Sequence, residues 1–174
     1  MKKQFQHGVG MIEVLVALAL LAIAVLGFSM LQLRALDAMQ EASDRTLAMT
    51  LARDLAERIR VNRTQLTEYK EKINSGLAGI SKSCNVPDST GSSRTTTPMC
   101  SRSETAAYDA SQMIQAVNNA GMKMIIGDCH GGDRQCIYIA WGDTTITQNN
   151  VSMCMVAGVY VAGAKCLVME AYGT

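Results

Sequence analysis

Side chains that could do chemistry concentrate in two segments of this 174-residue chain. Near the N-terminus, Glu13 is a lone carboxylate in an otherwise apolar stretch, residues 9–33. In the C-terminal half, a short loop has the sequence Asp128-Cys129-His130-Gly131-Gly132-Asp133-Arg134-Gln135-Cys136. The first segment could hold a charge pair inside a membrane or a helical bundle. The second could bind zinc or transfer protons.

The loop at 128–136 favours a disulfide over a metal site. A zinc site would use Cys129, His130 and Cys136, but a disulfide between the two cysteines would consume both thiols. Asp128 and Asp133 are better explained as solvated loop charges than as a general acid–base pair. We therefore expect no metal and no cofactor here.

Other enzyme classes lack their sequence motifs. The chain has no Gly-rich phosphate loop, no Gly-x-Ser-x-Gly elbow and no His-Glu-x-x-His run. Twelve methionines could suggest copper handling, but most of them occupy apolar positions of expected helices or strands. Core filling explains these better, and examples are Met113, Met153, Met155 and Met169. The sequence predicts a protein that is not an enzyme.

The apolar stretch around Glu13 is long enough to span a membrane. No charge interrupts residues 14–33, and about 20 apolar residues cross a bilayer's hydrocarbon core. A carboxylate inside such a segment is costly, so by default it marks function and needs a partner. The alternative is a glutamate near the membrane interface that reaches water.

The N-terminus differs from an ordinary secretory signal. Such a signal has an apolar core of about 7–15 residues followed by a small-residue cleavage site. Here the core is longer, and residues 32–37 continue as helix without an Ala-x-Ala site. Cleavage after Gly8 would instead leave Val9 as the first residue and Glu13 as the fifth. The apolar helix would then stay on the protein as an anchor.

The sequence Gly8-Val9-Gly10-Met11-Ile12-Glu13-Val14-Leu15-Val16-Ala17-Leu18 resembles the N-terminal signal of type IV pilins and pseudopilins. In that family, a prepilin peptidase cuts after the glycine and N-methylates the new first residue. The resemblance implies cleavage between Gly8 and Val9, N-methylation of Val9, and a role for Glu13 in assembly. In the family, the corresponding glutamate pairs with the amine of a neighbouring subunit. Val9 stands where the family more often has phenylalanine.

The resemblance also implies partners and a location. Expected partners are major and minor pilins, contacted through the N-terminal helix, the prepilin peptidase and the inner-membrane assembly platform. The chain would cross the bacterial inner membrane once, with a periplasmic C-terminal domain, and then enter a pilus on the cell surface. Lys2 and Lys3 agree, because basic residues stay on the cytoplasmic side.

Three functions remain open at this point. The chain could be a minor pilin of a type IV pilus or a minor pseudopilin of a type II secretion system. It could also be a single-pass membrane protein with a periplasmic binding domain. Without Lys2 and Lys3 it has 14 basic and 15 acidic side chains, a net charge of about −1. No basic surface is implied, so we expect no nucleic-acid partner.

Six cysteines lie in the C-terminal half, which suits an oxidising compartment. Six cysteines allow 15 pairings, which sequence alone does not distinguish. A sequential pairing is our choice because each pair then flanks a polar or glycine-bearing segment: Cys84–Cys100, Cys129–Cys136 and Cys154–Cys166. Each bridge would stabilise the fold by about 2–4 kcal/mol.

The expected domains are a leader at 1–8, a transmembrane half-helix at 9–33 and a head at 34–174. One helix is predicted from Val9 to about Val61, because no proline precedes Pro87. Its second half has an apolar face that a sheet should cover. The residues assigned to this face are Leu47, Ala48, Leu51, Ala52, Leu55, Ala56 and Ile59.

After this helix, the sequence predicts a loop at about 74–102 and a second helix at 102–120. Ser101 and Glu104 form a capping box, and Gly121 ends the helix. Strands are predicted at 137–141, 153–161 and 166–172, with a further one at 122–126. The expected fold class is α+β and type IV pilin-like: a long N-terminal helix, transmembrane in its first half, packed on a disulfide-tied antiparallel sheet.

Overall fold

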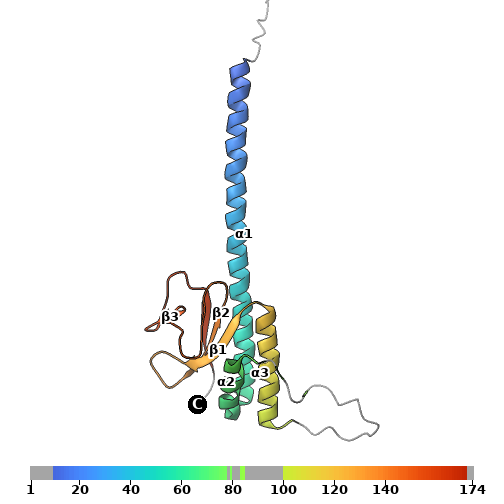
Figure 1. The fold of residues 1–174 in the computed structure, drawn as a ribbon, viewed down its shortest axis with the longest axis vertical. Helices are drawn as coiled ribbons and strands as arrows, with labels where there is room; N and C mark the ends of the chain where they lie inside the picture. The colour runs from blue at the N-terminus through green and yellow to red at the C-terminus, as the bar shows by residue number, and fades with distance from the viewer. Residues whose placement is uncertain (1–9, 78, 80–82, 85–99, 172–174) are drawn as a thin grey trace, which may run out of the picture. The chain divides into compact units, whose positions relative to one another are not determined.

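The computed structural model describes residues 10–77, 79, 83, 84 and 100–171 (Figure 1). In chain order its elements are α1 (Met11–Val61), the 3-10 helix η1 (Arg63–Gln65), α2 (Leu66–Ser75), α3 (Arg102–Asn119), β1 (Lys123–Asp128), β2 (Gln135–Ala140), β3 (Met155–Val156), β4 (Val159–Tyr160) and β5 (Cys166–Ala171). The chain divides into two compact units, Met1–Ser43 and Asp44–Thr174. The α+β class predicted from the sequence is confirmed.

Helix α1 ends at Val61, as the sequence predicts. Glu13 lies in its first turn and Arg58 and Arg60 in its last. The charges at both ends therefore interact favourably with the helix dipole. Within the apolar part, the Ser29 hydroxyl donates to the Val25 carbonyl at 2.9 Å. This polar side chain therefore needs no partner from outside the helix.

The buried stripe of α1 differs at one end from the predicted face. Ala48, Ala52, Leu55, Ala56 and Ile59 are buried, whereas Leu47 is 41% exposed. The prediction for Leu47 was wrong because a helix advances about 100° per residue. Each step of four residues overshoots a full turn by about 40°, so a series of such steps rotates away from the core.

Residues 62–75 form a helical segment that the sequence did not predict. Helix α2 buries Tyr69 and Ile73 and ends at Gly76, whose φ of 65° is left-handed. The predicted loop therefore starts after Ser75 rather than at Asn74. Most of that loop lies outside the described residues.

The second predicted helix is confirmed as α3. The Ser101 hydroxyl accepts from the Glu104 backbone N–H at 3.2 Å, and the Glu104 carboxylate accepts from the Ser101 N–H at 2.7 Å. This is the predicted capping box, which satisfies two backbone donors that the first helical turn leaves unpaired. Gly121 follows the helix with a φ of 66°.

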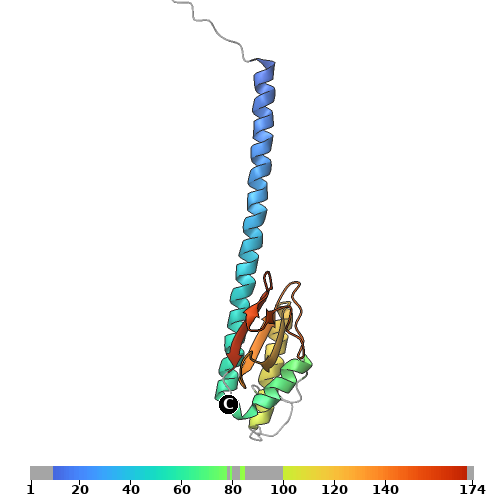
Figure 2. The same cartoon turned by 90° about the vertical axis from the view of Figure 1, so that its left-hand side faces the viewer.

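The main sheet is antiparallel, with strand order β1-β2-β5. In the register, Ile125 stands opposite Tyr138, and Tyr138 opposite Val168. Side chains alternate along each strand, so they point to two faces of the sheet. Each face packs against a hydrophobic core. Figure 2 shows the sheet lying against the helices, which cover one face.

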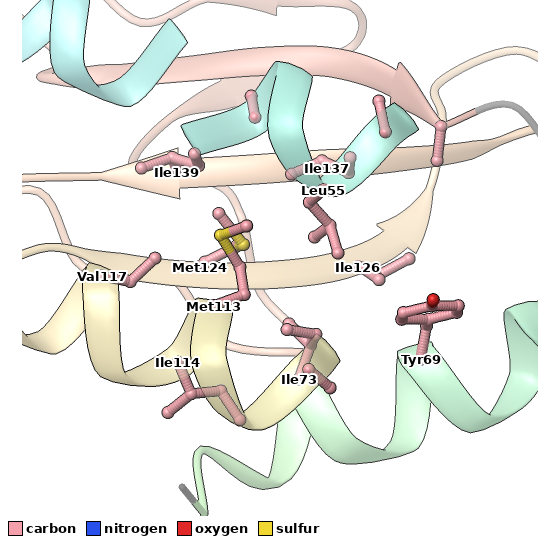
Figure 3. Close-up of a cluster of buried hydrophobic side chains, with 14 of the residues drawn as sticks. Leu55, Tyr69, Ile73, Met113, Ile114, Val117, Met124, Ile126, Ile137 and Ile139 are labelled. Atoms are coloured by element: carbon pink, nitrogen blue, oxygen red, sulfur yellow. The ribbon is translucent and has the colours of Figure 1, made fainter. Parts of the chain in front are cut away.

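The larger core lies between this face and the helices (Figure 3). Leu55 of α1 and Met113 of α3 meet Ile126, Ile137 and Ile139 of the sheet. The predicted covering of the apolar face of α1 by a sheet is confirmed. Small alanines at 48 and 52 of α1 are fully buried, which allows close approach of other elements to the helix.

A smaller core covers the opposite face of the sheet. Ile125 and Tyr138 contact Ile146 and Cys154 from the segment that joins β2 to β5. Cys154 is fully buried and bonded to Cys166. This segment therefore packs as a second layer, although it contains only two very short strands.

The strand predicted at 153–161 is instead a hairpin. β3 and β4 pair with each other, and the chain reverses at Ala157 and Gly158, whose φ values are 50° and 82°. Two successive positive φ values are typical of tight hairpin turns, which the apolar composition concealed. A Cβ atom at Gly158 would lie 2.6 Å from His130 Cδ2, so another residue would displace the imidazole and strain the backbone at this positive φ. The prediction of Met153 as a core residue was wrong, because it is 48% exposed.

A polar cluster joins the three helices. Arg58 of α1 contacts Asp109 of α3 at 2.6 Å and Asp54 at 2.9 Å. The Tyr69 hydroxyl of α2 donates to the other oxygen of Asp109 at 2.8 Å. Burial, and next this hydrogen bond to Asp109, raises the pKa of Tyr69 well above its ordinary value of 10.0.

We predict that the free energy of unfolding falls less steeply at alkaline pH in Tyr69→Phe than in the wild type. Above about pH 10 the unfolded chain loses the Tyr69 proton while the folded chain retains it, so the free energy of unfolding falls as pH rises. Urea unfolding of the full chain in detergent micelles, followed by Trp141 fluorescence, should show a shallower fall for Tyr69→Phe. At neutral pH the variant should lose about 1.5–3 kcal/mol, the contribution of a hydrogen bond to a charged group. Parallel curves for both proteins would contradict the role assigned to Tyr69.

Ser101→Ala should lower the free energy of unfolding by about 0.5–2 kcal/mol, because it removes a helix cap. The matched control is Ser103→Ala, two residues on, where the side chain is exposed in the first turn of α3. The same urea experiment measures both. Equal effects of the two substitutions would show that the cap contributes nothing specific.

Candidate functional site

The N-terminal part of α1 presents an apolar surface to its surroundings. Every residue from Gly10 to Leu33 is exposed, including Leu15, Leu21 and Phe28. Helix α1 is long and apolar enough to cross a membrane, with a mean hydropathy of 2.8 in its most apolar window. A bare apolar surface of this extent needs lipid or other apolar helices around it.

Glu13 is the one ionisable side chain between Gly10 and Leu33. Its backbone N–H donates to the Gly10 carbonyl at 2.9 Å, which places it in the first turn of α1. The positive end of the helix dipole favours a carboxylate there. Gly8 and Val9, the residues predicted to flank the cleavage site, lie outside the described residues.

The chemistry available to this site is charge pairing in an apolar environment. An unpaired carboxylate is expensive when it is surrounded by lipid or by apolar helices, and a paired one is much less so. Helix α1 supplies the carboxylate of Glu13, while Val14 to Leu33 supply no cation. If Glu13 lies in an apolar environment, a compensating positive charge comes from the residues before Gly10 or from another chain.

The three disulfides join the cysteines in sequential order: Cys84–Cys100, Cys129–Cys136 and Cys154–Cys166. Both thiols of the zinc-capable loop are therefore used in one bond. In the part of the chain that the structure describes, no three His, Cys, Asp or Glu side chains come together as a metal site. His130 is exposed and lies over Gly158.

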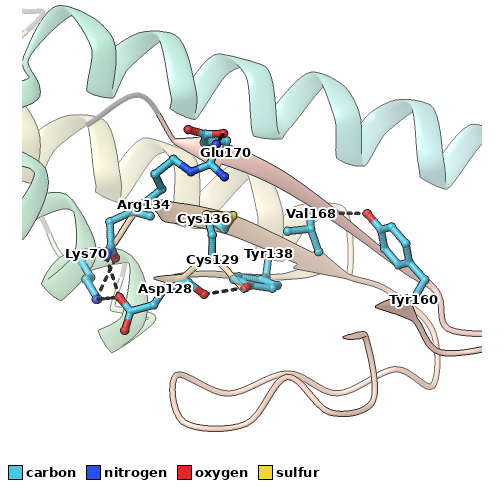
Figure 4. The surroundings of a disulfide bond; sticks show 10 residues. Lys70, Asp128, Cys129, Arg134, Cys136, Tyr138, Tyr160, Val168 and Glu170 are labelled. Atoms are coloured by element: carbon cyan, nitrogen blue, oxygen red, sulfur yellow. Dashed lines mark hydrogen bonds and ion pairs between the residues drawn. A yellow bond between two sulfur atoms is a disulfide. The ribbon is translucent and has the colours of Figure 1, made fainter. Parts of the chain in front are cut away.

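The carboxylate of Asp128, once a candidate acid or base, forms polar contacts across the fold (Figure 4). It accepts from the Gln135 amide at 2.6 Å and pairs with Lys70 at 3.3 Å. The hydrogen bond from Gln135, then the contacts with Lys70, lower the pKa of Asp128. A depressed pKa keeps the group ionised, which suits an anchoring contact rather than a general acid.

Sequence reasoning missed Lys70 and Gln135 as partners of Asp128. Lys70 lies in α2, 58 residues before Asp128, and also donates to Gln135 at 2.9 Å. The Tyr138 hydroxyl donates to the Asp128 carbonyl at 2.8 Å. Only Gln135 had a local clue, since it lies in the disulfide loop that directly follows Asp128. The cluster ties α2 to the sheet.

Two family models match the chain. Residues 3–29 match the prokaryotic N-terminal methylation motif, which includes Gly8, Val9 and Glu13. Residues 30–111 match the Tt1218-like model, described as type IV pilin Tt1218. Comparison with curated proteins and with solved structures gave no match. The methylation motif on an apolar helix, continued by the pilin region, makes this chain similar to type IV pilins over residues 3–111.

Proposed function

We propose that this protein is a minor pilin, a structural subunit of a type IV pilus without enzymatic activity. One observation carries the proposal: the first half of α1 is wholly exposed and apolar, with Glu13 as its only charge. Such a helix leaves a bilayer readily only into a bundle of like helices that supplies a positive charge. The core of a pilus fibre is such a bundle.

Processing would create the missing charge. Cleavage between Gly8 and Val9 leaves an amine four residues before Glu13, about 6 Å along a helix at 1.5 Å per residue. The amine of one subunit and the Glu13 carboxylate of the next would then pair and set their register. N-methylation of Val9 is compatible with this pairing, because a methylated amine keeps its positive charge.

The same reasoning assigns the parts of the chain. Residues 1–8 are the cytoplasmic leader and residues 9–33 the transmembrane and assembly half of α1. Residues 34–174 form the periplasmic head. Charged residues begin again at Arg34 and Asp37, where the apolar run ends. The three disulfides suit the oxidising periplasm.

The minor role is argued from sequence. The stretch from Ile12 to Leu18 and the pair Leu26-Gly27 resemble the minor pilin PilV. We propose that the chain primes fibre assembly or joins a tip complex that supports adhesion and twitching motility. A minor pseudopilin of a type II secretion system shares nearly the same motif. A deletion strain separates them, because loss of surface fibres supports the pilus and loss of protein secretion supports the pseudopilin.

Glu13→Gln should reduce incorporation of the protein into fibres at least tenfold, while insertion into the membrane stays normal. The neutral amide keeps the shape of the side chain but cannot compensate the amine of a neighbouring subunit. Immunoblots of sheared fibres and of membrane fractions measure the two quantities. The matched control is Asp37→Asn, which removes an exposed carboxylate of α1 outside the apolar run. Normal recovery of Glu13→Gln in fibres would overturn the assembly role.

The mature chain should begin at Val9. Intact mass and the N-terminal peptide of protein from native membranes measure this, and methylation of Val9 would add about 14 Da. Gly8→Val should block cleavage, because a branched side chain replaces the small residue that the peptidase cuts after. A wild-type chain that still begins at Met1 would contradict the pilin function and leave an ordinary membrane anchor.

A further inference from the structure

Strand β5 forms an edge of the main sheet. It pairs with β2 on one side, and no other described strand pairs with its second side. The Val168 N–H points away from β2, because it donates to the Tyr160 hydroxyl at 3.0 Å. Alternation along the strand then turns the backbone groups of Cys166 and Glu170 outward as well. Cys166 is buried, so we call the outward groups of residues 168 and 170 the β5 outer edge.

Within the described part of the chain, one side chain bonds to the middle of this edge. The Tyr160 hydroxyl, from β4, occupies the place where the carbonyl of an added strand would accept the Val168 proton (Figure 4). Tyr160 is 46% exposed, so its ring can turn away into solvent. One neutral hydrogen bond holds it, and such a bond contributes little net stability.

The hairpin beside the edge is apolar and uncharged. No charged residue occurs from Thr144 to Ala164, and the hairpin exposes Val156, Val159 and Val161 beside Tyr160. Proteins usually protect exposed edges with charges or with a covering element. An ion pair between Arg134 and Glu170 at 2.7 Å lies near the end of the edge.

We propose that the β5 outer edge binds an extended segment of another protein by β-strand addition. The added strand displaces the Tyr160 hydroxyl and supplies a backbone carbonyl to the Val168 N–H. Main-chain hydrogen bonds give affinity, and the exposed valines of the hairpin select apolar side chains at alternate positions. The exposed carboxylate of Glu170 disfavours acidic residues opposite it. The proposal does not rest on assembly through α1.

A second copy of this chain is a poorer occupant. Two β5 strands that join edge to edge in antiparallel fashion are related by a two-fold axis perpendicular to the sheet. Both β3–β4 hairpins then lie on the same side of the joined sheet, and two Tyr160 side chains compete for one seam. A lone extended segment displaces only one Tyr160 and brings no hairpin of its own.

Peptide binding to the full chain in detergent micelles tests the proposal. The probe is Gln-Ser-Ile-Tyr-Ile-Ala, the sequence of β2 with serine in place of Cys136, because β2 already pairs with β5 through this alternation. Backbone amide exchange should show new protection at Glu170. Tyr160→Phe, which removes the competing hydroxyl, should bind about fivefold more tightly, as expected for loss of one neutral hydrogen bond.

Two variants of Val168 provide the matched comparison. Val168→Pro removes the outward donor but no bond to β2, since proline is tolerated on an edge whose N–H faces outward. It should abolish binding while the amides of Ile137 and Ile139 stay protected. Val168→Ala keeps the N–H and should bind within threefold of wild type.

Three results would overturn the proposal. One is failure of Tyr160→Phe to bind the peptide at millimolar concentration. The second is binding with protection elsewhere and none at the β5 outer edge. The third is dimerisation of Tyr160→Phe through β5 in place of peptide binding, which would make a second copy the occupant.

Discussion

The requirement that the first half of α1 stay out of water governs this protein. Every side chain from Gly10 to Leu33 is exposed, and Glu13 is the sole charge among them. Lipid satisfies the apolar surface but not the carboxylate, whereas a bundle of helices with free amines satisfies both. This difference in how the carboxylate is solvated is the physical basis for proposing transfer from the membrane into a fibre.

The head is stabilised by other interactions, namely buried cores, disulfides and polar contacts. Its helices and sheet bury one core around Leu55, Met113 and Ile137, and a second layer covers the other face of the sheet. Disulfides and polar contacts then join segments that are distant in sequence, such as Arg58 with Asp109 and Lys70 with Asp128. These contacts hold the long connection between β2 and β5 in place although it has little regular structure. The β5 outer edge and the hairpin are the surface that we propose for binding another protein.

The family models support the similarity to pilins, whereas the role in a pilus is a proposal. The methylation motif and the Tt1218-like region concern residues 3–111. They support an anchored, processed subunit and do not distinguish a pilus from a secretion system. The β-sheet region lies after residue 111, outside both matched regions, so its arrangement is known from the structure alone.

The sequence by itself determined the elements that depend on local rules. Helix α1 followed from a long run without proline, and α3 from its Ser101–Glu104 cap and Gly121. Glu13 could be singled out because a charge inside an apolar run is visible in one dimension. Tertiary structure alone decided the rest, because it depends on contacts between distant residues. Helix α2 is stabilised by burying Tyr69 and Ile73, Leu47 turns outward as the helix rotates, and Tyr160 meets Val168 only after the 153–161 segment folds back at Ala157 and Gly158.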